Sequence, residues 1–240
     1  MNTSTLISYG KKISRDELAL IPTPDATRTH QPIPHHNIVQ SLIETLSFRH
    51  IGVLKDEYAV SVNGMKMFGV LDLETGFEGC RFSIGIRNSH DKSFRLAVTA
   101  GLRVTVCENM MFNGDFTPVL AKHSKNFSLQ DCLCIGVDRM QRNFEPMKRQ
   151  VEQWQQTQLP EITAKLIIYR AFVDGELEAP SSLMVTVHRN YFEPLHQEFS
   201  TRTLWSLGNA FTSAFKELDP IPQFKATARL GEFFSKVQQS

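Results

Sequence analysis

The chain has 240 residues, 41% of them apolar and 21% charged, which is typical of a globular protein able to bury a sizeable core. Its 26 basic and 25 acidic residues nearly balance, which excludes a protein coated in basic charge but not a local basic surface. Residues 1–14 lack the apolar core expected of a secretion signal, and the sequence contains no membrane-length apolar run and no CxxC pair. We therefore expect a cytoplasmic protein with reduced thiols and no membrane segment.

The first 50 residues predict an arm followed by a helix. Residues 1–34 carry four prolines among polar residues, and proline removes the backbone donors that regular structure needs, so a poorly anchored, flexible arm is expected. Residues 35–48 place Ile38, Val39, Leu42 and Leu46 at intervals of three and four, which predicts a helix.

An antiparallel sheet is predicted next. Alternating apolar residues on both sides of Asn63-Gly64 indicate a hairpin over residues 57–73 with a type I′ turn, and residues 82–86 form another strand. From Phe94 to Val106, residues of one parity are apolar, whereas Arg95, Thr99 and Arg103 are among those of the other. This pattern predicts a long curved strand with one face toward the core and one face away from it.

Helices dominate the rest of the chain. An apolar stripe at intervals of four and three predicts a long helix after Ser128, and Pro146 should kink or divide it. Further helices are expected at residues 162–172, 203–218 and 224–237, whereas residues 184–187 fit either a strand or the start of a helix. The stripe consists of Leu133, Val137, Met140, Phe144, Met147, Val151 and Trp154.

These elements predict an α+β fold. It has an N-terminal helix, a curved antiparallel β-meander with a long helix packed across it, and a helical C-terminal part. We expect residues 35–160 to form the core and residues 161–240 a mostly helical part of the same domain.

Residues 86–112 read IRNSHDKSFRLAVTAGLRVTVCENMMF. This stretch resembles the signature of the phage- and plasmid-borne family catalogued as domain of unknown function nine-three-two. The resemblance extends over about residues 34–230 and implies a mobile-element context but no activity. Glu108 departs from the small polar residue expected there, which argues against a thiol-centred role. The matching motif residues are Asn88, Ser89, His90, Asp91, Ser93, Gly101, Arg103, Cys107, Asn109, Trp205 and Asn209.

The order of elements is also similar, more distantly, to the Rad-fifty-two-like single-strand annealing proteins. That likeness implies a ring-forming protein that holds DNA in a basic groove between sheet and helices.

The candidate binding residues are basic. Residues 81–103 contain five basic residues and one acid, Asp91, a net charge of +4. If the sheet and the long helix face one groove, their basic side chains could contact the phosphates of a nucleic acid; the alternative is a solvated face. The candidates are Arg81, Arg87, Lys92, Arg95 and Arg103 on the sheet, and Arg139, Arg142, Lys148 and Arg149 on the helix.

Three interpretations apply to the run from Asn88 to Asp91. It can order a turn, contact a ligand, or supply His90 to a hydrolase. Adjacent strand residues point to opposite faces, so His90 and Asp91 cannot orient each other there, and the turn is favoured. The histidines show no metal-binding spacing and no phosphate-binding loop occurs, so no metal and no cofactor is expected.

The leading functional hypothesis is a non-enzymatic protein of a phage, plasmid or integrated element that binds single-stranded nucleic acid, for annealing or as a replication or recombination accessory. The alternatives are a protein-binding factor that counters a host defence system and a hydrolase centred on His90. Self-association is also expected, because Met147, Val151 and Trp154 lie beyond Pro146 and could reach a second subunit.

Overall fold

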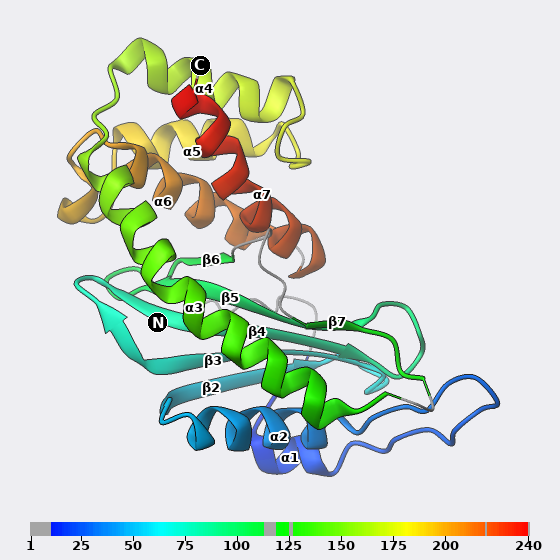
Figure 1. Ribbon diagram of the computed structural model, residues 1–240. Helices are drawn as coiled ribbons and strands as arrows, with labels where there is room; N and C mark the ends of the chain where they lie inside the picture. Colours follow the sequence, from blue (N-terminus) through cyan, green and yellow to red (C-terminus); the bar gives the residue numbers. More distant parts are fainter. Residues whose placement is uncertain (1–10, 113–118, 125–126, 219, 240) are drawn as a thin grey trace. The chain divides into compact units, whose positions relative to one another are not determined.

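Antiparallel strands dominate the first half of the chain in the computed structural model, which describes residues 11–112, 119–124, 127–218 and 220–239. The sheet follows the order β1-β2-β3-β4-β5, and β7 pairs with β5 (Figure 1). Each strand therefore lies beside its neighbour in sequence except at β7, which confirms the predicted meander. The strands are β1 (Lys11–Ile13), β2 (Val53–Val60), β3 (Lys66–Phe77), β4 (Cys80–Ser89), β5 (Leu96–Val104) and β7 (Val119–Ala121).

The chain forms two compact units, whereas residues 35–160 and 161–240 were expected to be parts of one domain. Of the described residues, the N-terminal unit contains those within 11–102 and 119–143, and the C-terminal unit contains those within 103–112 and 144–239. Both β5 and the long helix α3 (Leu129–Gln156) run from one unit into the other. The packing therefore groups the second half of α3 with the helices that follow it.

The predicted hairpin around Asn63-Gly64 is confirmed, but its turn differs from the predicted type. Strands β2 and β3 pair from Val60 and Met67 outward. The Gly64 backbone N–H donates to the Ser61 carbonyl at 2.8 Å, and Gly64 alone of the Asn-Gly pair has a positive φ, 68°. The strands end at Val60 and Lys66, so the loop is longer than the two residues that favour a type I′ turn.

Residues 1–34, predicted to be a flexible arm, contain regular structure in their described part. Strand β1 pairs with β2, and helix α1 (Arg15–Ala19) begins at a capping box between Ser14 and Glu17. Arg15 donates from Nε to Asp56 Oδ2 at 2.8 Å, and the Tyr58 hydroxyl donates to the same oxygen at 2.7 Å. The prolines begin after this helix, so the composition that predicted an arm applies to residues 22–34 alone.

Strand β5 is buried on both faces, which corrects the expectation of one face away from the core. All nine of its residues are buried, including Thr99 and Arg103 on the polar parity. Arg95 is exposed because it precedes the strand. Alternation of polar and apolar residues along β5 therefore did not indicate a solvated face, since residues of both parities are buried.

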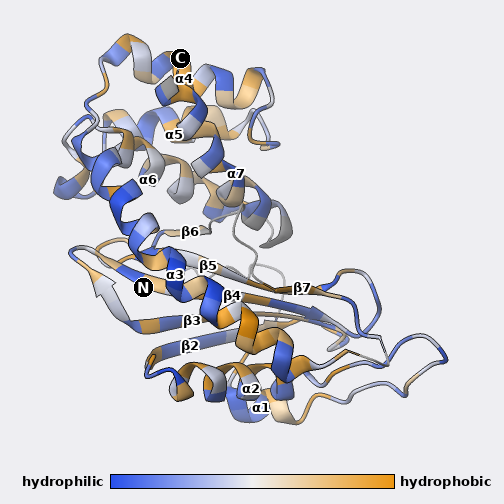
Figure 2. Cartoon of the chain, in the orientation of Figure 1, coloured by the Kyte–Doolittle hydropathy of each residue, from blue (hydrophilic) through white to orange (hydrophobic). Residues whose placement is uncertain are grey.

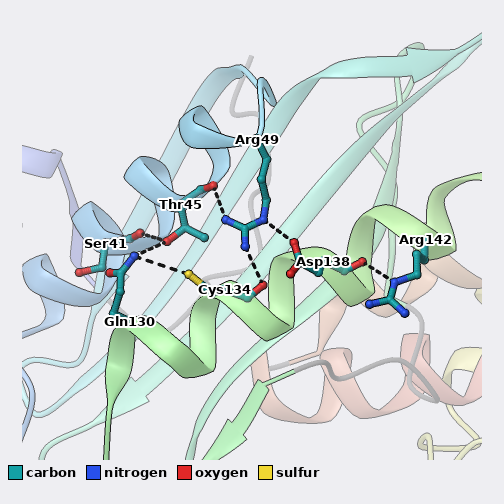
Figure 3. Close-up of polar contacts among 7 residues, drawn as sticks. All are labelled: Ser41, Thr45, Arg49, Gln130, Cys134, Asp138 and Arg142. Atoms are coloured by element: carbon teal, nitrogen blue, oxygen red, sulfur yellow. Dashed lines mark hydrogen bonds and ion pairs between the residues drawn. The ribbon is translucent and has the colours of Figure 1, made fainter.

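Helix α2 (His35–Phe48) and the first half of α3 lie side by side against the sheet (Figure 1). Both are amphipathic, and Figure 2 shows apolar residues interspersed with polar ones along each. Arg49, at the end of α2, joins them. Its Nε donates to Asp138 Oδ1 at 2.5 Å, and its two terminal nitrogens donate to the carbonyls of Cys134 and Thr45 at 3.2 and 3.3 Å (Figure 3).

Pro146 does not divide the predicted long helix, since α3 is a single helix of 28 residues that contains it. The second half of the apolar stripe is buried within the C-terminal unit. The Trp154 ring packs edge-on against Phe234, with centroids 5.4 Å apart and planes at 84°. The expectation that Met147, Val151 and Trp154 are free to reach a second subunit is therefore corrected.

The C-terminal unit is mainly helical, as predicted. Residues 184–187, left open between strand and helix, belong to a helix. A short hairpin joins the end of β5 to β6, where the Val104 backbone N–H donates to the Asn109 carbonyl at 2.9 Å. Of the described helices, none is long and apolar enough to cross a membrane. Besides the second half of α3, the elements of the C-terminal unit are β6 (Met110–Phe112), α4 (Glu161–Val173), α5 (Leu183–Phe192), the 3₁₀ helix Gln197–Phe199, α6 (Leu204–Ala214), the 3₁₀ helix Phe215–Glu217 and α7 (Pro220–Gln239).

We predict that Arg49→Gln lowers the melting temperature by roughly 2–5 °C, because a neutral amide cannot replace the three donated hydrogen bonds and the ion pair. Differential scanning calorimetry would measure the change. Arg142→Gln is the matched control: Arg142 is exposed and donates to the Asp138 carbonyl of its own helix, so its loss should leave the melting temperature unchanged. Equal effects of both substitutions would contradict the assigned role of Arg49.

Candidate nucleic-acid interface

A basic pocket of about 490 Å³ opens beside the turn between β4 and β5. Three segments form its walls: the arm at Thr29 and His30, the turn from Ser89 to Arg95, and the residues that follow β7, 122–124. Three cations, Lys92, Arg95 and Lys122, line it, and no carboxylate is among its described lining residues. We call this the basic pocket.

The side chains of Ser89 and Asp91 hold the turn between β4 and β5, whereas Asn88, also predicted to order this turn, donates to Ile33 and His35 instead. Ser89 Oγ donates to the Phe94 carbonyl at 2.8 Å and accepts from the Phe94 backbone N–H at 3.2 Å. Asp91 Oδ1 accepts from the Ser93 backbone N–H at 3.0 Å. Lys92 between them has a positive φ of 64°, an unusual conformation for a residue with a side chain. These contacts fix the turn that carries Lys92 and Arg95 to the pocket.

Four buried histidines of the N-terminal unit form two stacked pairs. The rings of His35 and His90 are stacked, with centroids 3.9 Å apart and planes at 5°. Those of His30 and His123 are also parallel, at 5.4 Å. His30 and His123 line the pocket as well. No group of described histidine, cysteine or acidic residues has an arrangement that could hold a metal ion.

Hydrogen bonds define the protonation of His35. Its Nδ1 accepts from Asn88 Nδ2 at 2.8 Å, and its Nε2 donates to the Gly64 carbonyl at 3.0 Å. A neutral imidazole with the proton on Nε2 satisfies both contacts. Burial, together with a smaller contribution from the neighbouring His90, lowers the pKa of His35 to about 4.

The remaining histidines link the arm to the sheet. His90 Nε2 donates to the Ile33 carbonyl at 3.0 Å, and the Ile33 backbone N–H donates to His123 Nδ1 at 3.3 Å. His30 Nε2 donates to the His90 carbonyl at 3.1 Å. Burial also lowers the pKa of His123 to about 4 and that of His90 in the same direction. Burial therefore favours the uncharged imidazoles of His90 and His123, which join the arm to the turn and to the residues that follow β7.

The structure brings together two of the nine predicted basic residues at this pocket. Lys92 and Arg95 line it, and Lys122, which sequence reasoning missed, joins them. Arg87 is half-buried with its guanidinium 5.7 Å from the centre of the Phe94 ring, and burial lowers its pKa. Arg81 lies near the opposite end of β4, roughly 25 Å along the strand from the turn.

The other predicted basic residues lie away from the pocket lining. Arg103 is buried in the C-terminal unit, 3.9 Å from Glu108. Arg139 and Arg142 are exposed on the first half of α3. On the second half, Lys148 pairs with Glu152 at 3.9 Å and Arg149 with Glu145 at 3.5 Å. Ion pairing of this kind leaves less positive charge available to a ligand.

The predicted motif residues form two groups, one in each unit. Asn88, Ser89, His90, Asp91 and Ser93 build the turn and the histidine network described above. In the C-terminal unit, Asn109 Nδ2 donates to the Asn209 carbonyl at 3.1 Å, Cys107 lies beside Asn209, and Trp205 is buried. Gly101 is buried within β5. Lys122 and His123 carry no local signal in the sequence, because pairing of β7 with β5 places them here.

The model of the family described as Domain of unknown function (DUF932) matches residues 28–231. The chain belongs to this family. The match begins at the arm and ends within α7, and it includes both groups of motif residues. Neither a curated protein nor a solved structure matches the chain significantly.

We predict that the N-terminal unit loses stability as the pH falls from 6.5 toward 4. The pKa of His35 and of His123 is below its ordinary value of 6.5 in the folded chain, so the unfolded chain takes up protons first. Stability from these neutral rings is complete above pH 6.5 and is lost progressively below it, by at most on the order of 3 kcal/mol for each ring. Thermal unfolding by circular dichroism across this range would measure the loss.

The His35→Gln variant should be less stable at pH 7 and should show a shallower loss on acidification, since one of the titrating rings is absent. His188→Gln serves as the matched control, because His188 is exposed on α5 and should retain the parent profile. If the stability of the His35→Gln variant fell with pH as steeply as that of the parent, the proposed contribution of neutral His35 would be refuted.

Proposed function

We propose that this protein binds single-stranded nucleic acid without acting as an enzyme, and that it serves a phage, plasmid or integrated element as a replication or recombination accessory in the cytoplasm. The basic pocket of the N-terminal unit would hold the phosphate backbone. Family membership gives no activity, so the proposal depends on the chemistry of this pocket.

The convergence of Lys92, Arg95 and Lys122 carries the proposal. The three residues come from two segments of the chain and are exposed. Asp91, the acid nearest in sequence, lies 3.9 Å from Lys66 instead. No described carboxylate lies within ion-pair distance of the three cations. Unpaired cations that converge on a concave surface attract phosphate groups strongly.

Other features of the pocket also suit a single strand. The half-buried Phe94 ring lines it, and an aromatic face can stack with a base. Hydroxyl groups of Thr29, Ser93 and Ser124 can donate hydrogen bonds to phosphate oxygens. A cavity of 490 Å³ admits one or two nucleotides rather than the width of a duplex.

The test is a titration of a fluorescent single-stranded oligonucleotide at several salt concentrations. Binding should weaken steeply with salt, and each phosphate neutralised should contribute about 0.7 to the log–log slope. Replacing Lys92, Arg95 and Lys122 together by Gln should reduce the slope by about 2. Because all three side chains are exposed, the melting temperature should stay the same.

Arg81→Gln and Arg149→Gln are controls that each remove one positive charge away from the pocket, at the other end of β4 and on α3, and are compared with the single pocket substitutions. Both should retain nearly the parent slope. The proposal fails if the parent chain shows no binding at low salt, or if the control substitutions lower the slope as much as the pocket substitutions do.

The geometry does not favour the alternative of a hydrolase centred on His90. Nucleophilic catalysis needs a serine or cysteine in hydrogen-bond reach of a base. Ser89 Oγ is bonded to the Phe94 backbone, and His90 Nε2 is directed to the Ile33 carbonyl. No described contact joins the two side chains.

We further propose that the chain self-associates through α4 rather than through the Trp154 stripe. Ile162, Leu166, Tyr169 and Val173 lie on one face of α4, and each is at least half exposed. The opposite face is buried. Helix α4 has an acid, Glu161, in its first turn and a base, Arg170, in its last. An antiparallel pair of α4 helices from two copies would bring these opposite charges together and cover both apolar faces.

Light scattering should therefore give a mass near twice 27.3 kDa at micromolar concentration. Leu166→Glu should shift the protein to a monomer, because it places a charge in the centre of the apolar face. Val62→Glu, at a fully exposed hairpin position in the N-terminal unit, is the matched control and should leave the mass unchanged. A parent chain that stays monomeric would overturn self-association and favour a different protein partner for this face.

A further inference from the structure

The arm, residues 22–34, joins helix α1 to helix α2. Helix α2 begins directly after it at His35, and no helix or strand lies within it. Thr29 and His30 of the arm form one wall of the basic pocket. The arm therefore shapes the pocket, although it forms no part of the sheet.

The hydrogen bonds that hold the arm to the rest of the unit converge on Ile33. Its carbonyl accepts from His90 Nε2 at 3.0 Å and from Asn88 Nδ2 at 3.2 Å. Its backbone N–H donates to His123 Nδ1 at 3.3 Å. Three side chains thus hold one residue of the arm, and two of them are imidazoles.

Few other polar contacts attach the arm. His30 Nε2 donates to the His90 carbonyl at 3.1 Å, and the His30 ring is parallel to that of His123. The Gln31 backbone N–H donates to the His123 carbonyl at 3.2 Å. No ion pair joins the arm to another residue in the described part of the chain. Attachment of the arm therefore depends strongly on the state of the imidazoles.

Protonation of His123 conflicts directly with this attachment. A neutral His123 that accepts the Ile33 N–H at Nδ1 carries its own proton on Nε2. A second proton would sit on Nδ1 and place two N–H donors against each other. Protonation of His90 would leave its Nε2 bond intact but would add a charge 3.9 Å from the centre of the stacked His35 ring.

The surrounding charges do not compensate for protonation. Asp91 favours a charged His90, but burial outweighs this effect and lowers the pKa of His90, and Asp91 lies 3.9 Å from Lys66. Burial lowers the pKa of His123 to about 4, with smaller contributions from His30 and His90. The charged residues that line the pocket beside His123 are the cations Lys92, Arg95 and Lys122.

Movement of the arm is the smallest rearrangement that lets these rings take up protons. Strands β3 and β4 pair through backbone hydrogen bonds that contain no titrating group, so the sheet can persist while the arm opens. Opening removes the arm from His90 and His123 and exposes both rings to water. A local opening of this kind needs less free energy than unfolding of the whole unit.

We propose that the arm is a strap that closes one wall of the basic pocket while His90 and His123 are uncharged, and that it opens when they take up protons. The turn between β4 and β5 and the residues after β7 stay in place and keep their cations. The inference goes beyond the proposed function, since it concerns the shape of the pocket and holds whatever the pocket binds.

Hydrogen exchange of the full-length protein at pH 7 and pH 5, followed by mass spectrometry and corrected for the intrinsic effect of pH on exchange, tests the proposal. If opening returns the pKa of His123 from about 4 to its ordinary value of 6.5, the opening constant rises about 20-fold between these pH values. Peptides that contain the amides of Gln31 and Ile33 should therefore lose protection by roughly tenfold or more.

A peptide from the middle of β4 distinguishes opening of the arm from unfolding of the unit. It should be far better protected than the arm at both pH values. Low concentrations of urea should accelerate its exchange but hardly change that of the arm, because local opening exposes little surface. Equal protection and equal urea dependence of the two peptides would overturn the proposal, as would arm protection that is the same at pH 7 and pH 5.

Two conservative substitutions isolate the imidazoles. In His123→Asn the amide oxygen replaces Nδ1 as the acceptor, in His90→Gln the amide nitrogen replaces Nε2 as the donor, and neither amide titrates. The double variant should keep the arm closed at pH 5, with protection that changes by less than about threefold between the two pH values. If it does not fold, His123→Asn alone decides.

His50→Asn is the matched control. His50 is an exposed histidine of the same unit, and its positive φ of 58° is a conformation that asparagine also adopts. This variant should retain the pH dependence of the parent chain. Parent-like loss of arm protection in the variant that lacks the titrating rings would overturn the proposal and leave the proposed role of the basic pocket unaffected.

Discussion

The Asn88 side chain holds the N-terminal unit's arm against its sheet. Its amide nitrogen donates to the Ile33 carbonyl at 3.2 Å and to His35 Nδ1 at 2.8 Å, so one buried group fixes both the end of the arm and the start of α2. The arm then supplies one wall of the basic pocket. A buried amide without these partners would leave its hydrogen-bond donors unsatisfied, at a cost in free energy. Asn88 on β4 therefore determines where the distant arm lies.

The buried imidazoles extend this constraint. His35 and His90 are stacked at 3.9 Å, a distance at which two positive charges would repel strongly, and burial already disfavours charge on each ring. The network that positions the pocket is therefore built from neutral groups, whereas the pocket itself carries the cations on its exposed rim. Because the buried imidazoles are neutral and the cations are exposed, the site can attract an anion although no unpaired charge is buried.

The residues of the family signature are divided between the two units, because the chain passes from one unit to the other within β5. Residues 88–93 build the turn of the N-terminal unit, and Cys107 and Asn109 contact Asn209 in the C-terminal unit. In each place an asparagine is buried and its amide nitrogen makes two hydrogen bonds. Burying a polar amide costs free energy unless its donors and acceptor find partners. A buried amide of fixed orientation therefore indicates a position where a specific donor or acceptor is required.

The sequence by itself determined the helices at residues 35–48 and 162–172, the hairpin at Asn63-Gly64 and the α+β order, because each depends on local periodicity or turn chemistry. It also indicated Lys92 and Arg95 as exposed basic residues. The tertiary structure alone decided that Lys122 and His123 join them, that Trp154 packs on Phe234, and that Thr99 and Arg103 are buried. The physical reason is that burial and proximity depend on contacts between segments that are distant in the chain. The spacing of residues within one segment does not predict such contacts.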